Sequence, residues 1–105
     1  MTLTFKEACS AVADVFEFCP EAWTSRTAAR DAAGGPVSWA DASASSWCLW
    51  GALMACGLRP MSAQLTPIAK RLGYRDFMLL NDIGGRLLTI KMLRIAAGEL
   101  APKAD

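Results

Sequence analysis

The sequence contains no histidine. This absence removes the usual general base near neutral pH, the usual nitrogen ligand for zinc, and the usual activator of a serine or cysteine nucleophile. Proline and glycine occur only at ordinary levels, with five and eight copies in 105 residues, which excludes collagen-like and proline-rich chains. The longest apolar run, Trp47 to Leu58, has 12 residues, whereas a membrane-spanning helix needs about 20. We therefore predict a protein that is not an enzyme, uses no metal or cofactor, and does not span a membrane.

The sequence contains enough apolar residues to form the core of one folded domain. Apolar residues make up 53% of the chain and charged residues 20%, which is typical of a globular protein and not of a disordered one. A length of 105 residues suits one hydrophobic core that needs no disulfide or metal. We expect a single helical domain over residues 1–98 and a mobile tail over residues 99–105.

The four cysteines lack the C-x-x-C spacing of a metal site. Cys9 and Cys19 are expected on one helix, as are Cys48 and Cys56, and a rise of about 1.5 Å per residue then holds each pair beyond disulfide reach. The first residues show neither the basic nor the apolar region of a signal peptide. Free thiols, together with first residues that do not resemble a signal peptide, predict a protein of the reducing cytoplasm.

Hydrophobic spacing predicts about four helices. The first begins at a capping box formed by Thr4 and Glu7 and ends before Pro20. The run Trp47 to Cys56 is apolar on every side, which predicts a buried central helix that the others surround. Gly51 inside this helix indicates that a backbone or an aromatic ring packs closely against it. Two further helices are expected, one from Ser62 or Thr66 to Gly73 and one from Arg86 to Ala97.

The segment between the first helix and the central helix lacks a helical period. Small residues from Asp31 to Gly35 favour a chain reversal, so this segment is predicted to be a short β-hairpin or an ordered loop. The later segment Asp76–Leu80 could be one helical turn or an edge strand, and Asn81–Gly85 is predicted to be a turn. The predicted fold class is therefore mainly α, a single small domain of about four helices around a buried central helix.

Four separated groups of residues follow one another in a characteristic order. They are Trp23-Thr24, then Ala29-Arg30-Asp31 with Gly35-Pro36-Val37, then Trp47-Cys48-Leu49-x-Gly51-Ala52-Leu53, and finally Asn81-Asp82. This order resembles a domain-of-unknown-function family of small proteins found in bacteriophages and bacterial genomes. The resemblance implies no established activity, catalytic residue or cofactor. It does imply a phage-type accessory protein, which would act in the cytoplasm of the host cell.

Candidate binding residues lie between the first two predicted helices. Tryptophan and arginine carry interface energy more often than other residues, which makes Trp23, Arg26, Arg30 and Trp39 the candidate partner contacts. We predict a non-enzymatic protein-binding module that binds and blocks a host protein or ribonucleoprotein complex. If the chain is phage-encoded, one form of this function is an anti-CRISPR inhibitor. The alternative for the two tryptophans is that they cap the core from the loop.

A second hypothesis is a helix-turn-helix-like DNA-binding protein that uses residues 66–86. Residues 66–75 are typical of the first helix and turn of such a motif, and Arg71, Arg75 and Arg86 would contact phosphates. The next segment is apolar and acidic, which does not suit a recognition helix, so direct DNA binding is the less favoured hypothesis. The glycines before Arg86 could instead leave amides free for an anion, although a plain turn explains them equally well.

Charge is unevenly distributed along the chain. Residues 1–52 carry three basic and six acidic groups, a net −3, whereas residues 53–105 carry eight basic and four acidic groups, a net +4. This polarity could orient the molecule on a charged partner or help the two halves of the fold attract each other. An exposed Phe77–Leu80 segment would further offer a homodimer contact.

Overall fold

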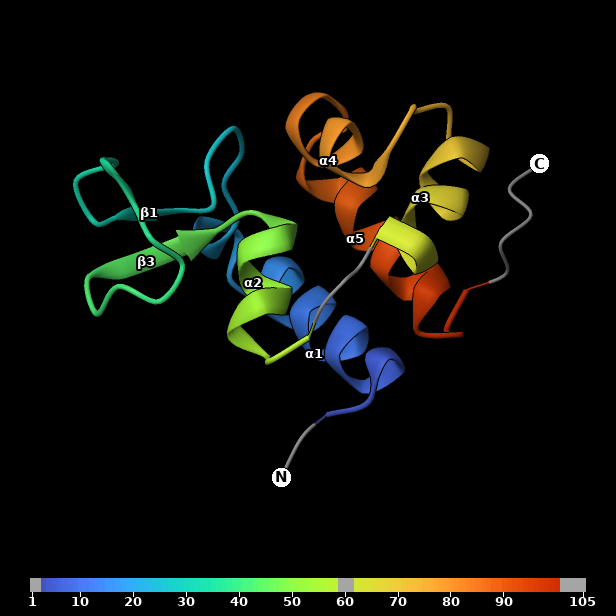
Figure 1. The fold of residues 1–105 in the computed structure, drawn as a ribbon, viewed down its shortest axis with the longest axis horizontal. Coiled ribbons are helices and arrows are strands. Elements are labelled where there is room, and N and C mark those ends of the chain that lie inside the picture. The colour runs from blue at the N-terminus through green and yellow to red at the C-terminus, as the bar shows by residue number, and fades with distance from the viewer. Residues whose placement is uncertain (1–2, 59–61, 101–105) are drawn as a thin grey trace.

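The computed structural model describes residues 3–58 and 62–100, and these contain five α-helices and one three-stranded sheet. Figure 1 shows the sheet at one end of the molecule and α3, α4 and α5 at the other. The elements are, in order, α1 (Phe5–Phe18), η1 (Pro20–Ala22), β1 (Ala29–Asp31), β2 (Pro36–Val37), β3 (Ala44–Trp47), α2 (Leu49–Ala55), α3 (Ser62–Arg71), α4 (Phe77–Leu79), η2 (Leu80–Gly84) and α5 (Arg86–Ala96). The mainly α prediction agrees with this structure, but the described helices number five and not four.

Side chains cap α1 at both ends. Thr4 Oγ1 accepts a hydrogen bond from the Glu7 amide at 3.1 Å, and Glu7 Oε1 accepts one from the Thr4 amide at 2.9 Å, so the predicted capping box is confirmed. At the other end, Arg86 Nη1 donates to the carbonyl oxygen of Phe16 at 2.8 Å. This bond satisfies one of the last carbonyls of the helix and places a cation at the negative end of its dipole.

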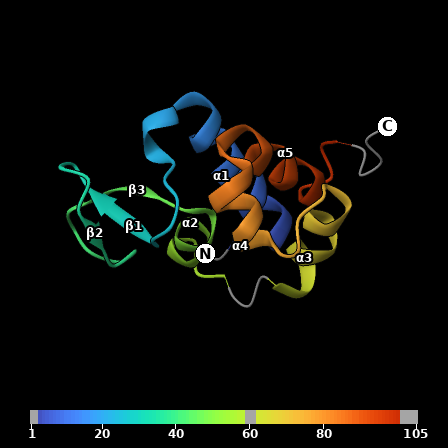
Figure 2. The same cartoon turned by 90° about the horizontal axis from the view of Figure 1, so that it is seen from above.

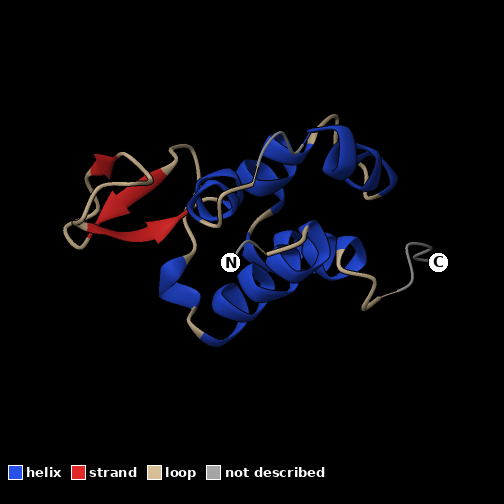
Figure 3. Ribbon diagram, turned by 60° about the horizontal axis from the view of Figure 1, so that its bottom comes forward, coloured by secondary structure: helices blue, strands red, loops and turns tan. Residues whose placement is uncertain are grey.

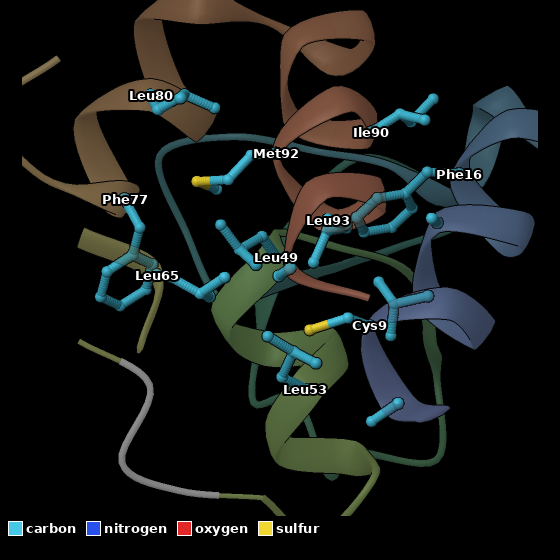
Figure 4. Close-up of a cluster of buried hydrophobic side chains, with 14 of the residues drawn as sticks. Cys9, Phe16, Leu49, Leu53, Leu65, Phe77, Leu80, Ile90, Met92 and Leu93 are labelled. Carbon is cyan, nitrogen blue, oxygen red and sulfur yellow. The ribbon is translucent and has the colours of Figure 1, made fainter. Parts of the chain in front are cut away.

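The central helix of the core is α5, so the prediction that residues 47–56 form a buried central helix is wrong. α5 packs against α1, α3 and η2, whereas α2 contacts mainly α1 and β3. Trp47 belongs to β3, and α2 begins only at Leu49. Because α2 lies at the edge of the helical layer, part of its apolar surface stays open, and Ala55 is exposed. Figure 4 shows the core, in which side chains from α1, α2, α3, α4 and α5 meet around Met92 and Leu93.

The sheet has the strand order β2-β1-β3 with antiparallel neighbours. The chain reverses between β1 and β2 where the sequence predicts, because Asp31 Oδ1 accepts the amides of Ala33 and Gly35 at 3.0 and 2.8 Å. A parallel bridge between Trp23 and Trp47 extends the pairing beyond β3. The views in Figures 2 and 3 show that the sheet stands beside the helices and does not cover them.

The segment after α3 forms one helical turn and not an edge strand. Asp76 caps α4 by accepting the Leu79 amide on Oδ1 at 2.9 Å, and a π-helical turn, η2, follows directly. Phe77 and Leu80 are buried within the chain's own core, so this segment does not present the exposed dimer contact considered above.

The described part of the predicted tail is attached to the helices. Glu99 accepts hydrogen bonds from Arg94 Nη1 at 2.9 Å and from the hydroxyl of Ser10. Residues 101–105 of the predicted tail lie outside the described residues. No helix in the described ranges is both long and apolar enough to cross a bilayer.

Candidate functional site

A buried side chain, Asn81, joins the sheet to the helices. Its Oδ1 accepts hydrogen bonds from Trp23 Nε1 at 2.9 Å and from the Leu49 amide at 3.1 Å. Its Nδ2 donates to the Thr24 carbonyl at 3.2 Å and to Asp82 Oδ1 at 3.0 Å. Asn81 has no exposed surface, and these four bonds use both of its donors and both lone pairs of its acceptor. We call this set of contacts the Asn81 junction.

Two of the predicted binding residues, Trp23 and Arg30, hold the chain around this junction. All three guanidinium nitrogens of Arg30 donate within the loop: Nε to Thr24 Oγ1 at 2.9 Å, Nη1 to the Gly34 carbonyl at 3.0 Å and Nη2 to the Ser25 carbonyl at 3.1 Å. Both side chains are half-buried. Each therefore has a structural role, and a role in partner binding stays a prediction for them.

The other two predicted binding residues, Arg26 and Trp39, form hydrogen bonds through their backbone. Arg26 is exposed and adopts a left-handed backbone conformation with φ 70°, and its amide donates to Asp82 Oδ1 at 2.9 Å. Trp39 is half-buried, and its carbonyl oxygen accepts a hydrogen bond from Trp47 Nε1 at 3.1 Å. The side chains of Trp23 and Arg30 are thus bonded internally, whereas the bonds of Arg26 and Trp39 described here are made by their backbone. Of the four residues only Arg26 is exposed, and Trp39 is half-buried like Trp23 and Arg30.

The close packing predicted at Gly51 is confirmed. A Cβ at this position would collide with the carbonyl oxygen of Ala28 and would lie 3.4 Å from Cβ of Trp39. The start of α2 is fixed in the same region, because Cys48 Sγ accepts the Gly51 amide at 3.3 Å and the Cys48 amide donates to the Ala28 carbonyl at 3.1 Å. The backbone before β1 therefore lies directly against α2.

An open apolar groove of about 180 Å³ lies between α1 and α2. We call it the α1–α2 groove, and it is lined by Ala11, Val12, Val15, Phe16, Trp47, Ala52, Ala55 and Cys56. Val15 is 45% exposed, and Phe18, almost one turn later on α1, is 75% exposed. The reading of the sequence missed this groove, although Ala11, Val15 and Phe18 recur at helical steps of four and three residues beside the core stripe.

The residues of the DNA-binding hypothesis do not form a matching site. Arg71, the last residue of α3, and Arg75 in the loop after it are exposed, but Arg86 donates to the carbonyl of Phe16 and so holds α1. The position of a recognition helix is taken by α4 and η2, whose residues Phe77, Leu80 and Asn81 are buried. Such a helix must present side chains to base edges, which buried residues cannot do.

Nucleophilic and metal-binding groups are few in the described part of the chain. Burial raises the pKa of the Cys9 thiol to about 12, with a contribution from nearby Cys56, and burial also raises the pKa of the Cys48 and Cys56 thiols. A raised pKa keeps a thiol protonated and unreactive at neutral pH. Within residues 3–58 and 62–100, no three cysteine, aspartate or glutamate side chains are grouped to hold a metal ion.

Comparisons of the chain with protein-family models, curated proteins and solved structures found no match. The family resemblance drawn from the sequence therefore stays a prediction. The structure adds one fact about its residue groups. Trp23-Thr24, the start of α2 at Leu49, and Asn81-Asp82 all meet at the Asn81 junction, and Arg30 is bonded to Thr24. The pattern thus coincides with the contacts that hold the sheet to the helices.

Proposed function

We propose that this chain is a non-enzymatic protein-binding module that binds its partner through the α1–α2 groove. The observation that supports this proposal most is the open apolar surface formed by the groove and the adjacent exposed side chain of Phe18. Apolar surface in contact with water is unfavourable, and a continuous apolar patch on a small protein is typical of an interaction site.

One of the binding residues predicted from the sequence, Trp39, lies beside this groove. Trp47 lines the groove and donates its indole N–H to the carbonyl of Trp39. A partner that covers Trp47 would therefore lie close to the loop that carries Trp39. Arg26, which is exposed and whose backbone is held by Asp82, is a further candidate contact. We propose the groove as the principal contact and Trp39 and Arg26 as additional ones.

A finer proposal concerns the identity of the partner. The family resemblance supports a phage-type accessory protein whose partner is a host protein or ribonucleoprotein complex. Binding would then block that complex, as an anti-CRISPR inhibitor does. A non-enzymatic inhibitor needs only to occupy a surface of its target, and a small domain with one apolar contact site is sufficient for that role.

The test compares capture of partner proteins from a bacterial lysate by variants of the tagged chain. The double substitution Ala11→Gln and Ala55→Gln adds uncharged bulk on both walls of the groove, and Ala63→Gln changes an exposed alanine of α3 as the control. Nuclease-resistant proteins that bind wild type and the control but not the double variant would support the proposal. Equal capture by all three would overturn the groove as the binding surface.

Nuclease treatment separates the two function hypotheses. Capture that disappears with nuclease, and that falls when Arg71 and Arg75 are replaced by glutamine, would favour nucleic-acid binding over the present proposal. Capture of a ribonucleoprotein that survives nuclease and inhibits its activity in a cleavage assay would support the inhibitor form of the proposal.

A further inference from the structure

The volume of the α1–α2 groove limits the size of the side chain that can enter it. A cavity of about 150 Å³ in a protein interior holds one benzene molecule. The groove has a volume of about 180 Å³ and is bounded by aromatic and aliphatic side chains, including Val15, Trp47 and Ala55. It therefore accommodates one large apolar side chain of a partner, such as leucine or phenylalanine, as an anchor.

The backbone around the groove favours a helical partner over an extended one. An extended peptide leaves its N–H and C=O groups unpaired and needs a free sheet edge to bind them. Most of the lining residues lie within α1 and α2, where the backbone is bonded within the helix. The lining contains one strand residue, Trp47. Its carbonyl oxygen already accepts a hydrogen bond from the Thr24 amide at 3.0 Å. A helix pairs most of its own backbone N–H and C=O groups, so a helical partner needs only side-chain contacts with the groove.

The charges beside the groove are negative. Glu7 and Asp14 are exposed on α1, one turn before and one turn after Ala11 of the groove wall. The opposite wall contributes no charge, because residues 47–58 contain no aspartate, glutamate, lysine or arginine. The only basic residue of α1, Lys6, lies on the side of α5, where its Nζ would be 3.7 Å from a Cβ at Gly98.

A single arginine does not neutralise this acidic edge. Arg94 of α5 forms ion pairs with Asp14 at 2.8 Å, Glu17 at 2.7 Å and Glu99 at 2.9 Å, so three carboxylates share one guanidinium. Asp14 keeps 54% of its side chain exposed. Glu17, Glu99 and Arg94 line a separate pocket beside α5, so only Glu7 and Asp14 stand at the α1 edge of the groove. Their two carboxylates exceed the single guanidinium that Asp14 shares, so this edge is net negative and attracts a cationic partner.

We propose that the α1–α2 groove binds a basic amphipathic helix of a partner protein, which inserts one large apolar side chain between α1 and α2. This inference rests on the proposed function, because it names the kind of partner that the same groove takes. The apolar face of the helix would cover Val15 and Phe18, and its lysine or arginine residues would lie along Glu7 and Asp14.

The experiment uses three synthetic peptides of about 18 residues, since shorter helices are marginal in water. The first places leucine at helical spacing and lysine elsewhere, the second replaces every lysine by glutamate, and the third has the composition of the first with leucine and lysine alternating. Isothermal titration calorimetry measures the affinity of each for the folded wild-type chain. The proposal requires the first peptide to bind most tightly. Tighter binding of the glutamate peptide or of the alternating peptide would overturn it.

Variants then locate the bound peptide. The Ala11→Gln and Ala55→Gln double variant is expected to weaken binding of the first peptide by roughly tenfold or more, because the anchor loses its place, while Ala63→Gln leaves it unchanged. The double variant Glu7→Gln and Asp14→Asn removes both negative charges, and glutamine at position 7 can still complete the capping box with Thr4. We expect it to weaken peptide binding by roughly three- to tenfold at low salt. Unchanged affinity in either double variant would contradict the proposal.

The peptide measurement and the lysate capture fail in different ways. If capture of lysate proteins depends on the groove but binding of the first peptide does not, then the proposed function stands and the proposal of a basic helical partner is wrong. If neither depends on the groove, then both proposals are wrong. Formation of a dimer by the wild-type chain that the Ala11→Gln and Ala55→Gln substitutions abolish, seen by analytical ultracentrifugation, would identify a second copy as the occupant and would also overturn the basic helix.

Discussion

Trp23 donates its indole N–H to the side-chain oxygen of Asn81 at 2.9 Å, across 58 positions of the sequence. The same oxygen accepts the amide of Leu49, so one buried acceptor serves the loop before the sheet and the first turn of α2. A buried polar group costs free energy if its partner is lost, so the fold is expected to be sensitive to changes at the Asn81 junction.

Asn81→Leu tests the junction by removing its hydrogen bonds while keeping the branching and the number of heavy atoms of the side chain. The substitution leaves the Trp23 indole, the Leu49 amide and the Thr24 carbonyl without their partner, and we expect the free energy of unfolding to fall by roughly 3 kcal/mol or more. Urea denaturation measures the change. Trp23→Phe removes the indole donor and part of the ring that packs against the core, and should cost less than Asn81→Leu, about 1–2 kcal/mol. An equal cost for the two variants would show that Asn81 does not join the segments.

Gly51→Ala tests the close contact between α2 and the backbone before β1. The new methyl group would collide with the Ala28 carbonyl, which cannot move without breaking its bond to the Cys48 amide. We expect a loss of about 1–3 kcal/mol in the free energy of unfolding, although alanine is the better helix former. Gly35→Ala is the matched control, because its Cβ would meet only the Asp31 carboxylate, at 3.4 Å, which is an ordinary contact distance. Wild-type stability of Gly51→Ala would contradict the contact.

Two neighbouring arginines are expected to differ in their effect on stability. Arg30→Met removes three internal hydrogen bonds and should lower the free energy of unfolding by roughly 1–3 kcal/mol. Arg26→Gly relieves a left-handed conformation that glycine adopts freely, and should leave stability unchanged or raise it by up to about 1 kcal/mol. Thermal denaturation measures both, and a larger loss for Arg26→Gly would reverse this assignment. Weaker partner capture by folded Arg26→Gly would support the predicted binding role of Arg26.

The sequence predicts the local features of this fold well. The capping box of Thr4 and Glu7 and the reversal at Asp31 depend on residues within a few positions of each other, and both occur as expected. The interpretation of Asn81 as a turn residue misses its main role. Asparagine is common in turns, and nothing near it in the sequence shows that its side chain will meet Trp23.

The candidate site was harder to predict for the same reason. An apolar run such as residues 47–56 is equally consistent with burial on all sides and with a groove on one side, because only the packing of α5 decides which helix is central. The tendency of tryptophan and arginine to occur in interfaces predicts binding roles for Trp23 and Arg30, but the polar atoms of both side chains form hydrogen bonds within the chain. The spacing of Ala11, Val15 and Phe18 was the available signal for the groove.

The buried thiol of Cys9 predicts a loss of stability at alkaline pH. Burial raises the pKa of Cys9 from 9.0 to about 12, so between these values the folded chain keeps a proton that the unfolded chain releases. Because the native state binds more protons in this interval, the free energy of unfolding falls as pH rises from 9 towards 12, by about 1.4 kcal/mol per pH unit for one group. Cys48 and Cys56, whose pKa values are also raised by burial, add to the slope in the same direction.

Cys9→Ala should therefore flatten this dependence without abolishing it. Urea denaturation at several values above pH 9, with a reducing agent present, measures the slope for wild type and variant. Cys19→Ala, which removes an exposed thiol at the end of α1, is the matched control and is expected to keep the wild-type slope. If Cys9→Ala and Cys19→Ala give the same slope as wild type, then burial of Cys9 is not what makes the folded state sensitive to alkali.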